Sequence, residues 1–122
     1  MYAAFAPREE MRIFGRGIRR RLAPMLGGDR ARLELAYSLL FTLPGTPVIV
    51  YGDEIGMGED LSLAGRNSVR TPMQWDGTAN AGFSTARADE LIRPVVTAGR
   101  FGKDKVNVAA QAADPGSLLS WM

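Results

Sequence analysis

The most regular pattern of apolar residues lies between positions 29 and 43, where leucine, alanine and tyrosine recur at the three- and four-residue spacing of a helix. Two glycines precede Asp29, a residue type that commonly caps a helix N-terminus. The pattern predicts a helix over about 29–43. Because the apolar stripe is wide, we expect the helix to pack on more than one side, against a sheet. The apolar positions are Leu33, Leu35, Ala36, Tyr37, Leu39, Leu40 and Leu43.

A short apolar run follows the predicted helix. The segment PGTP at 44–47 ends the helix, since proline and glycine interrupt helical backbone. The next four residues, VIVY at 48–51, are rich in β-branched side chains and contain no charge, which is typical of a buried parallel strand. Helix, tight turn and buried strand in series predict one step of an α/β fold.

Beyond this strand, from 52 to 84, the chain has neither helical nor strand periodicity, and glycine recurs throughout. Large apolar side chains remain within the segment, so we predict an ordered loop in place of disorder. The carboxyl ends of parallel strands are where α/β enzymes bind their ligands, so this loop is the expected site region. The large side chains are Met57, Met73, Trp75 and Phe83.

The end of the chain predicts another helix. Asp114 followed by Pro115 has the order of an N-cap and a proline at the first helical position. The helix would run through Leu118 and Trp121 and stop at Met122. A (β/α)₈ barrel needs roughly 250 residues, and this chain has 122. We therefore predict that residues 1–122 are part of one domain, with no complete domain.

Composition restricts the chemistry. The chain has no histidine and no cysteine, so the usual general base, the thiolate nucleophile and the disulfide framework are all excluded. Acid–base chemistry would have to use Asp, Glu, Lys or Tyr. We expect no cofactor and no metal. The lack of cysteine is compatible with a reducing compartment, and we predict a cytoplasmic protein.

The charge is close to balanced, with a formal net charge of +2. Basic residues gather early in the chain without the interleaved aromatic residues of a nucleic-acid surface. We interpret them as a solvated or salt-bridged face and expect no nucleic-acid partner. No segment reaches the roughly twenty apolar residues of a membrane span, so no membrane partner is expected either. The early basic residues are Arg8, Arg12, Arg16, Arg19, Arg20 and Arg21.

Two acidic pairs are candidates for chemistry. Asp53 and Glu54 directly follow the predicted strand; one interpretation is a pair of carboxylates for glycoside hydrolysis. Neighbours on extended backbone point in opposite directions, so we favour the other interpretation, in which they anchor the loop through backbone N–H groups and an arginine. Glu59 and Asp60 lack the alternating spacing of a calcium loop, so we predict no metal there.

Arg70 is the candidate for ligand binding. The planar, permanently charged guanidinium is suited to holding sugar hydroxyls or a carboxylate. Pro72 restricts the residue before it to extended conformations, which stiffens the backbone beside Arg70. Gln74 and Trp75 follow closely, and arginine, amide and aromatic ring together suit carbohydrate recognition. The alternative is a surface arginine near a core tryptophan.

These segments resemble a known family. GTPVIVYGDEIGM at 45–57 resembles the region of the eighth barrel strand in the α-amylase superfamily, glycoside hydrolase family 13. RTPMQW at 70–75 resembles the following loop in its α-glucosidase and trehalose synthase branch. Other segments are most similar to the trehalose synthase members: GIRRRLAPML at 17–26, VNV at 106–108 with Gln111, and DPGSLLSWM at 114–122.

The resemblance implies a fragment of a (β/α)₈ TIM barrel. It would cover roughly helix 7, strand 8, the long loop after that strand and the start of helix 8. The family uses a retaining mechanism, and its catalytic carboxylates follow strands that this chain does not include. One of them belongs to an Asn-His-Asp motif, which a chain without histidine lacks. We therefore assign no catalytic residue and predict that the segment is inactive by itself.

The resemblance also implies a function for the parent protein. It would interconvert maltose and trehalose by intramolecular transglucosylation, with a disaccharide as its small-molecule partner; a homo-oligomeric parent is compatible with this. Arg70 would contact the glucose in the −1 subsite, while Asp53, Glu54 and Gln74 would support the barrel mouth. Two alternatives stay open: a hydrolytic α-glucosidase or oligo-1,6-glucosidase, and a non-catalytic fragment.

Overall fold

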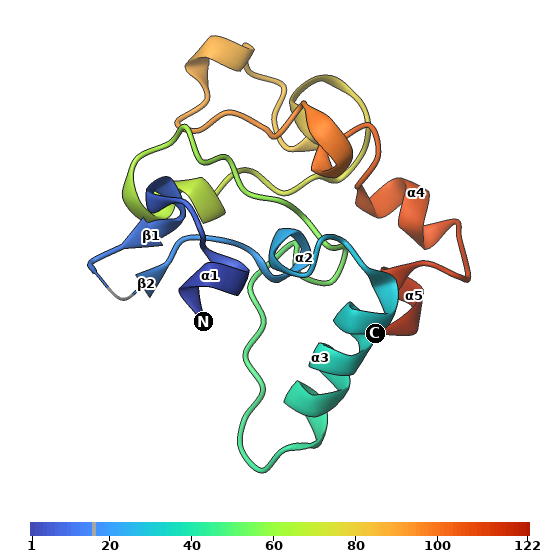
Figure 1. Ribbon diagram of the computed structural model, residues 1–122. Coiled ribbons are helices and arrows are strands. Elements are labelled where there is room, and N and C mark those ends of the chain that lie inside the picture. Colours follow the sequence, from blue (N-terminus) through green and yellow to red (C-terminus); the bar gives the residue numbers. More distant parts are fainter. Residues whose placement is uncertain (16) are drawn as a thin grey trace.

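The computed structural model describes residues 1–15 and 17–122. Most of the chain between the longest helix and the C-terminal helices is loop, interrupted by 3₁₀ turns (Figure 1). The helices are α1 (Tyr2–Phe5), α2 (Leu22–Met25), α3 (Arg30–Thr42), α4 (Val108–Ala112) and α5 (Leu118–Trp121). The 3₁₀ turns are η1 (Glu9–Met11), η2 (Gly65–Val69), η3 (Ala79–Gly82), η4 (Ala88–Glu90) and η5 (Gly99–Phe101), and the strands are β1 (Arg12–Ile13) and β2 (Gly17–Ile18).

The predicted helix is confirmed as α3. The carboxylate of Asp29 accepts a hydrogen bond of 3.0 Å from the backbone N–H of Arg32, as an N-cap should. The expected packing is wrong, however, because only Leu33 and Tyr37 of this helix are buried. Among the described residues, the sheet consists of the antiparallel pair β1 and β2, and no sheet covers α3. The apolar stripe of α3 is therefore largely exposed, with Leu35 at 62%.

The predicted buried strand over 48–51 is also wrong. These residues form no strand, and all four side chains are exposed, Val48 to 76%. A parallel strand exists only where a neighbour accepts and donates its backbone hydrogen bonds, and no strand lies beside this segment in the described part of the chain. In Figure 1 the segment returns past α3 as an irregular ribbon.

The C-terminal helix begins three residues later than the Asp114–Pro115 pair predicts. Ser117 is the N-cap of α5, and its hydroxyl accepts a hydrogen bond of 3.1 Å from the N–H of Ser120. The carboxylate of Asp114 instead accepts the N–H of Gly116 at 2.8 Å. Asp114 is thus engaged in a local turn, which is a common alternative use of an aspartate beside proline and glycine.

Two small apolar clusters hold the elements together. The first joins α2, α3 and α5 through Ala23, Leu33, Tyr37 and Leu118. The second joins the loop after residue 51 to the C-terminal segment through buried Ile55, Met57 and Met73, against which Val106, Val108 and Leu119 pack. Figure 1 shows α5 beside the first turn of α3, in keeping with a hydrogen bond of 2.8 Å from Arg30 to the carbonyl of Gly116. The loop is therefore fixed from both ends of the chain.

Candidate functional site

A pocket of about 520 Å³ lies along the loop that follows the apolar run. We call it the Arg70 pocket. Its walls are mostly apolar and aromatic, with a few charged side chains, which is the usual make-up of a small-molecule site. The lining residues come from four stretches of the loop: Tyr51 and Glu54; Arg70, Pro72, Met73 and Trp75; Phe83, Ser84 and Ala86; and 90–93.

Arg70 lies at the C-terminal end of η2, where its N–H donates to the carbonyl of Asn67 at 3.0 Å. It is exposed, whereas the four residues after it, 71–74, are all buried. Its guanidinium makes no hydrogen bond or ion pair with any residue that the structure describes. The backbone of Arg70 therefore precedes a buried segment, while its guanidinium lies at the pocket wall without a partner among the described residues. A fixed backbone and an available charged group together suit ligand binding.

Tyr51 also lines the pocket. Its hydroxyl donates a hydrogen bond of 3.0 Å to the carbonyl of Thr71. Sequence reasoning treated Tyr51 only as the end of a strand and missed it. An aromatic residue directly before GDE at the end of an apolar run is the signal that could have identified it.

Asp53 and Glu54 have separate environments. Asp53 accepts hydrogen bonds from Arg21 Nη1 at 3.2 Å and from the N–H of Val50 at 3.1 Å, the two contacts that an anchor makes. It does not line the Arg70 pocket, whereas Glu54 does. Glu54 Oε2 is buried and has no hydrogen-bond partner among the described residues. The two carboxylates therefore do not flank one ligand position.

Tyr37 reaches this region from α3. Its hydroxyl donates to the carbonyl of Asp53 at 3.0 Å. Burial raises the pKa of Tyr37 above its ordinary value, and the nearby carboxylates of Asp53 and Glu54 raise it further. Tyr37 therefore stays a neutral hydrogen-bond donor and ties α3 to the turn that carries both acids.

Gln74 is fully buried and is not part of the pocket wall. Its Nε2 donates to the carbonyl of Phe101 at 3.2 Å and also to that of Val106. Gln74 thus connects the backbone beside the pocket to η5 and to the approach to α4. The next residue, Trp75, lines the pocket and is about half exposed.

The second acidic pair is engaged in internal contacts. Glu59 Oε1 accepts a hydrogen bond of 2.7 Å from Arg20, and Oε2 accepts the N–H of Arg21 at 3.0 Å. Asp60 accepts the N–H of Ser62 at 3.0 Å. In the described part of the chain, no group of three or more acidic, histidine or cysteine side chains is arranged to hold a metal ion.

Of the predicted solvated or salt-bridged face, the salt-bridged form is confirmed for Arg20, which pairs with Glu59, and for Arg21, which pairs with Asp53. A solvated position is wrong for Arg19, Arg20 and Arg21. Arg21 is only 4% exposed, and Arg19 and Arg20 are half-buried. Arg19 donates to the carbonyl of Leu61 at 2.7 Å, so these side chains anchor the loop from within. The composition of a run of arginines does not indicate which of its side chains will be buried. Arg16 lies outside the described residues.

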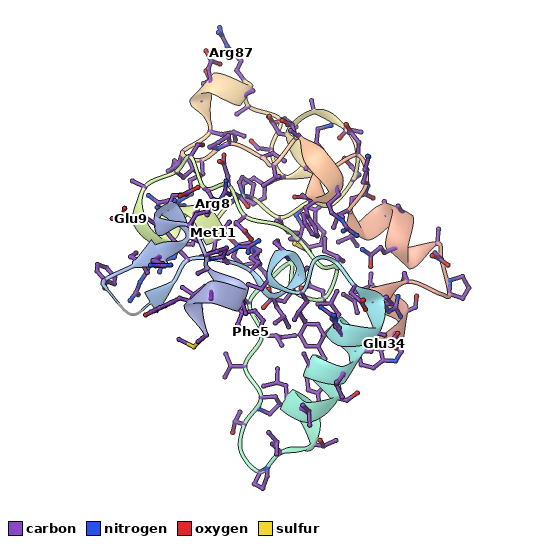
Figure 2. All side chains as sticks on the ribbon, viewed as in Figure 1. Phe5, Arg8, Glu9, Met11, Glu34 and Arg87 are labelled. Carbon is purple, nitrogen blue, oxygen red and sulfur yellow. The ribbon has the colours of Figure 1, made fainter. Side chains whose placement is uncertain are left out.

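Other charged side chains do lie on the surface. Figure 2 shows Arg87 projecting from η4, far from α3 and Glu34. Arg87 pairs with its neighbour Asp89 at 2.8 Å, and Arg8 pairs with Glu10 at 3.0 Å. Exposed pairs of this kind contribute little to stability. No helix in the described residues is long and apolar enough to cross a membrane.

Several proteins are similar to this chain over most of its length. The chain is 53% identical over 121 residues to a trehalose synthase of Thermus thermophilus, covering 99% of this chain and 12% of that protein. It is 50% identical over 123 residues to the trehalose synthase/amylase TreS of Mycolicibacterium smegmatis, covering 99% and 20%. It is also 51% identical over 112 residues to the human amino acid transporter heavy chain SLC3A1, covering 78% and 16%.

The fold has a counterpart among solved structures. The trehalulose synthase MutB of Pseudomonas mesoacidophila superimposes with a TM-score of 0.63 at 24% sequence identity, over 84% of this chain and 24% of that one. The chain spans only 12% to 20% of the length of the curated relatives named above. The family profile described as alpha amylase, catalytic domain, matches residues 16–122. The chain belongs to the alpha-amylase catalytic domain family.

Proposed function

We propose that this chain forms part of a retaining α-glucosyl-transferring enzyme that interconverts maltose and trehalose by intramolecular transglucosylation. The observation that carries the proposal is the Arg70 pocket, in which a free guanidinium borders a space lined by Tyr51, Trp75 and Phe83. Its volume of about 520 Å³ is in the range of small-molecule sites. Similarity to proteins named trehalose synthase supports the choice of reaction.

The chain would supply one sector of the barrel. In this proposal α3 would be helix 7. Residues 48–51, which form no strand within the described chain, would pair as strand 8 with neighbouring strands of the full barrel. The long loop would follow residue 51, and α4 with α5 would begin helix 8. The exposed apolar side chains of α3 and of 48–51 support it, because they would then pack on the other strands and helices. A row of exposed leucine and valine side chains has no such partner within the described chain.

The contacts support the following roles in the site. The guanidinium of Arg70 would donate hydrogen bonds to the hydroxyl groups of a glucose unit, since it has no internal partner among the described residues. Trp75 and Phe83 would offer apolar faces to the sugar ring. Asp53 and Gln74 would hold the loop through their contacts with Arg21 and with Phe101, and Glu54 would complete the wall. The nucleophile and the acid–base carboxylate would come from other strands of the barrel.

Isomerisation requires that water be kept out while the glucosyl group is held. Hydrolysis competes at every turnover, so the pocket must close over the released glucose. The loop from 52 to 107 provides the apolar wall of the Arg70 pocket and would form part of this enclosure. A cytoplasmic location and a homo-oligomeric parent stay predictions.

The test is product analysis with the full-length protein that carries this chain. Maltose is supplied, and trehalose and glucose are quantified over time by chromatography. We expect trehalose as the main product and glucose as the minor one. Glucose alone would favour the hydrolytic alternative, which is supported by a relative named both synthase and amylase. If neither trehalose nor glucose forms, the non-catalytic alternative is favoured; similarity to a protein named an amino acid transporter heavy chain is compatible with it.

A further inference from the structure

Arg21 lies outside the Arg70 pocket, yet it contacts the backbone next to Arg70. Its Nη2 donates a hydrogen bond of 3.0 Å to the carbonyl of Val69. That carbonyl belongs to the peptide group that leads directly into Arg70. Because Arg21 is only 4% exposed, its guanidinium has few alternative positions, and the peptide is held in one orientation.

The backbone after Arg70 is held as well, at the Thr71–Pro72 peptide. Tyr51 donates to the carbonyl of Thr71 at 3.0 Å. Tyr51 is in turn fixed by Arg21, whose Nη1 donates to the Tyr51 carbonyl at 2.9 Å and whose guanidinium carbon lies 5.4 Å from the centre of the Tyr51 ring. One buried arginine therefore fixes the peptide that precedes Arg70 directly, and through Tyr51 it fixes the Thr71–Pro72 peptide, one residue after Arg70.

The charge of Arg21 is balanced where it is buried. Its Nη1 also donates to Asp53 Oδ1 at 3.2 Å, so the guanidinium is paired with a carboxylate. The planar fork allows Nη1 and Nη2 to reach chain segments near 51 and 69 at the same time. A lysine ammonium is compact and cannot reproduce this two-sided geometry.

We propose that Arg21 is a positioning residue for Arg70, and that with Tyr51 it sets the direction in which the Arg70 guanidinium meets the sugar. This inference rests on the proposed function. It adds Arg21 to the residues on which sugar binding depends, although Arg21 itself does not touch the substrate. Displacement of a binding group by about 1 Å can cost about 100-fold in rate. Loss of the Arg21 geometry should thus impair catalysis well beyond its effect on folding.

A purely structural role is the competing explanation, and Arg19 provides the matched control. Arg19 belongs to the same basic run and donates to the carbonyls of Leu61 and Leu63, in the same loop but away from Arg70. Arg19→Lys removes the contacts of a half-buried arginine with the same loop and leaves the peptides that carry the Val69 and Thr71 carbonyls untouched. Both variants are made in the full-length protein, and kcat, KM and Tm for each are measured with maltose.

The expected result is a fall in kcat/KM of about 100-fold for Arg21→Lys, and a change of no more than about twofold for Arg19→Lys, with similar losses in Tm. In an Arg70→Ala background, Arg21→Lys should cause little further loss, because its effect passes through Arg70. Equal kinetics of the two lysine variants, or a full additional loss in the Arg70→Ala background, would overturn the inference.

A second variant covers the case in which Arg21→Lys does not fold. Tyr51→Phe removes the hydroxyl donor to Thr71 and keeps the ring beside Arg21. We expect it to lower kcat/KM in the wild-type background and to add little in the Arg70→Ala background; additive losses would contradict the inference. A wild-type protein that neither binds maltose in calorimetry nor converts it would instead overturn the proposed function, and this inference with it.

Discussion

The hydroxyl of Tyr51 lies 3.0 Å from the carbonyl oxygen of Thr71 and donates a hydrogen bond to it. This contact joins the apolar segment after α3 to the buried stretch after Arg70. It explains how an exposed arginine can stand on a fixed backbone within a loop that has little regular secondary structure.

Gln74→Ala should destabilise the protein without a direct effect on the pocket wall. The substitution leaves the carbonyls of Phe101 and Val106 without their side-chain donor in a buried place. We expect a loss of about 2 kcal/mol in the free energy of unfolding, measured by thermal melting of the full-length protein. Thr85→Ala, at an exposed position, is the control and should leave Tm unchanged. An unchanged Tm for Gln74→Ala would show that Gln74 does not anchor the loop.

Tyr37→Phe should change the pH dependence of stability. The folded state raises the pKa of Tyr37 above its ordinary value of 10.0, so above pH 10 the unfolded chain loses this proton first. The unfolded state then binds fewer protons, and the stability that Tyr37 contributes falls as the pH rises above 10. Near neutral pH, loss of the hydrogen bond to Asp53 should make the variant less stable by about 1 kcal/mol.

The difference in Tm between wild type and Tyr37→Phe should therefore narrow as the pH rises above 10. Tyr2 and Tyr51 are present in both proteins, so their titration cancels in the comparison. A difference that stays constant from pH 7 to 11 would contradict the assignment of a buried, neutral Tyr37.

Asp29→Ala should weaken the start of α3. The carboxylate caps the helix by accepting the N–H of Arg32, and loss of such a cap costs about 1 kcal/mol. Asp29→Asn keeps an oxygen acceptor and should lose much less. If both variants melted at the same lowered temperature, the charge of Asp29, and not its capping oxygen, would be responsible.

The 122-residue chain by itself should self-associate. Leu35, Leu39, Leu43 and Val48 expose large apolar side chains on α3 and the segment after it. Contiguous apolar surface of this kind drives association in water. Sedimentation velocity should show mass rising with concentration, and Leu39→Glu combined with Val48→Glu should reduce the effect. A monomer at all concentrations would argue against the role of this surface.

Local signals in the sequence were sufficient for α3 and its cap, because Asp29 and the spacing of Leu33 and Tyr37 act within a few turns of one helix. They were insufficient for residues 48–51, since a strand depends on a neighbour that lies elsewhere. For Asp114 the reason is different: the sequence allowed two local uses, a helix cap or a turn, and the structure has the turn.

The candidate site divides in the same way. Arg70 and Trp75 could be selected from side-chain chemistry and from the stiffening effect of Pro72, and both line the pocket. Gln74, chosen with them, is directed into the interior instead. Arg21 was hidden in a run of arginines, because its role depends on carbonyl groups 30 and 48 positions further along the chain.

Arg70→Ala in the full-length protein is the most direct test of sugar binding by Arg70. Arg70 is exposed and its side chain has no partner among the described residues, so its removal should leave Tm nearly unchanged. Arg66→Ala, at another exposed arginine of η2, is the matched control and should keep both activity and Tm. With maltose as substrate, we expect wild type to form trehalose and Arg70→Ala to form it about 100-fold more slowly. If Arg70→Ala formed trehalose as fast as wild type and Arg66→Ala, the assignment of Arg70 as a sugar contact would be contradicted.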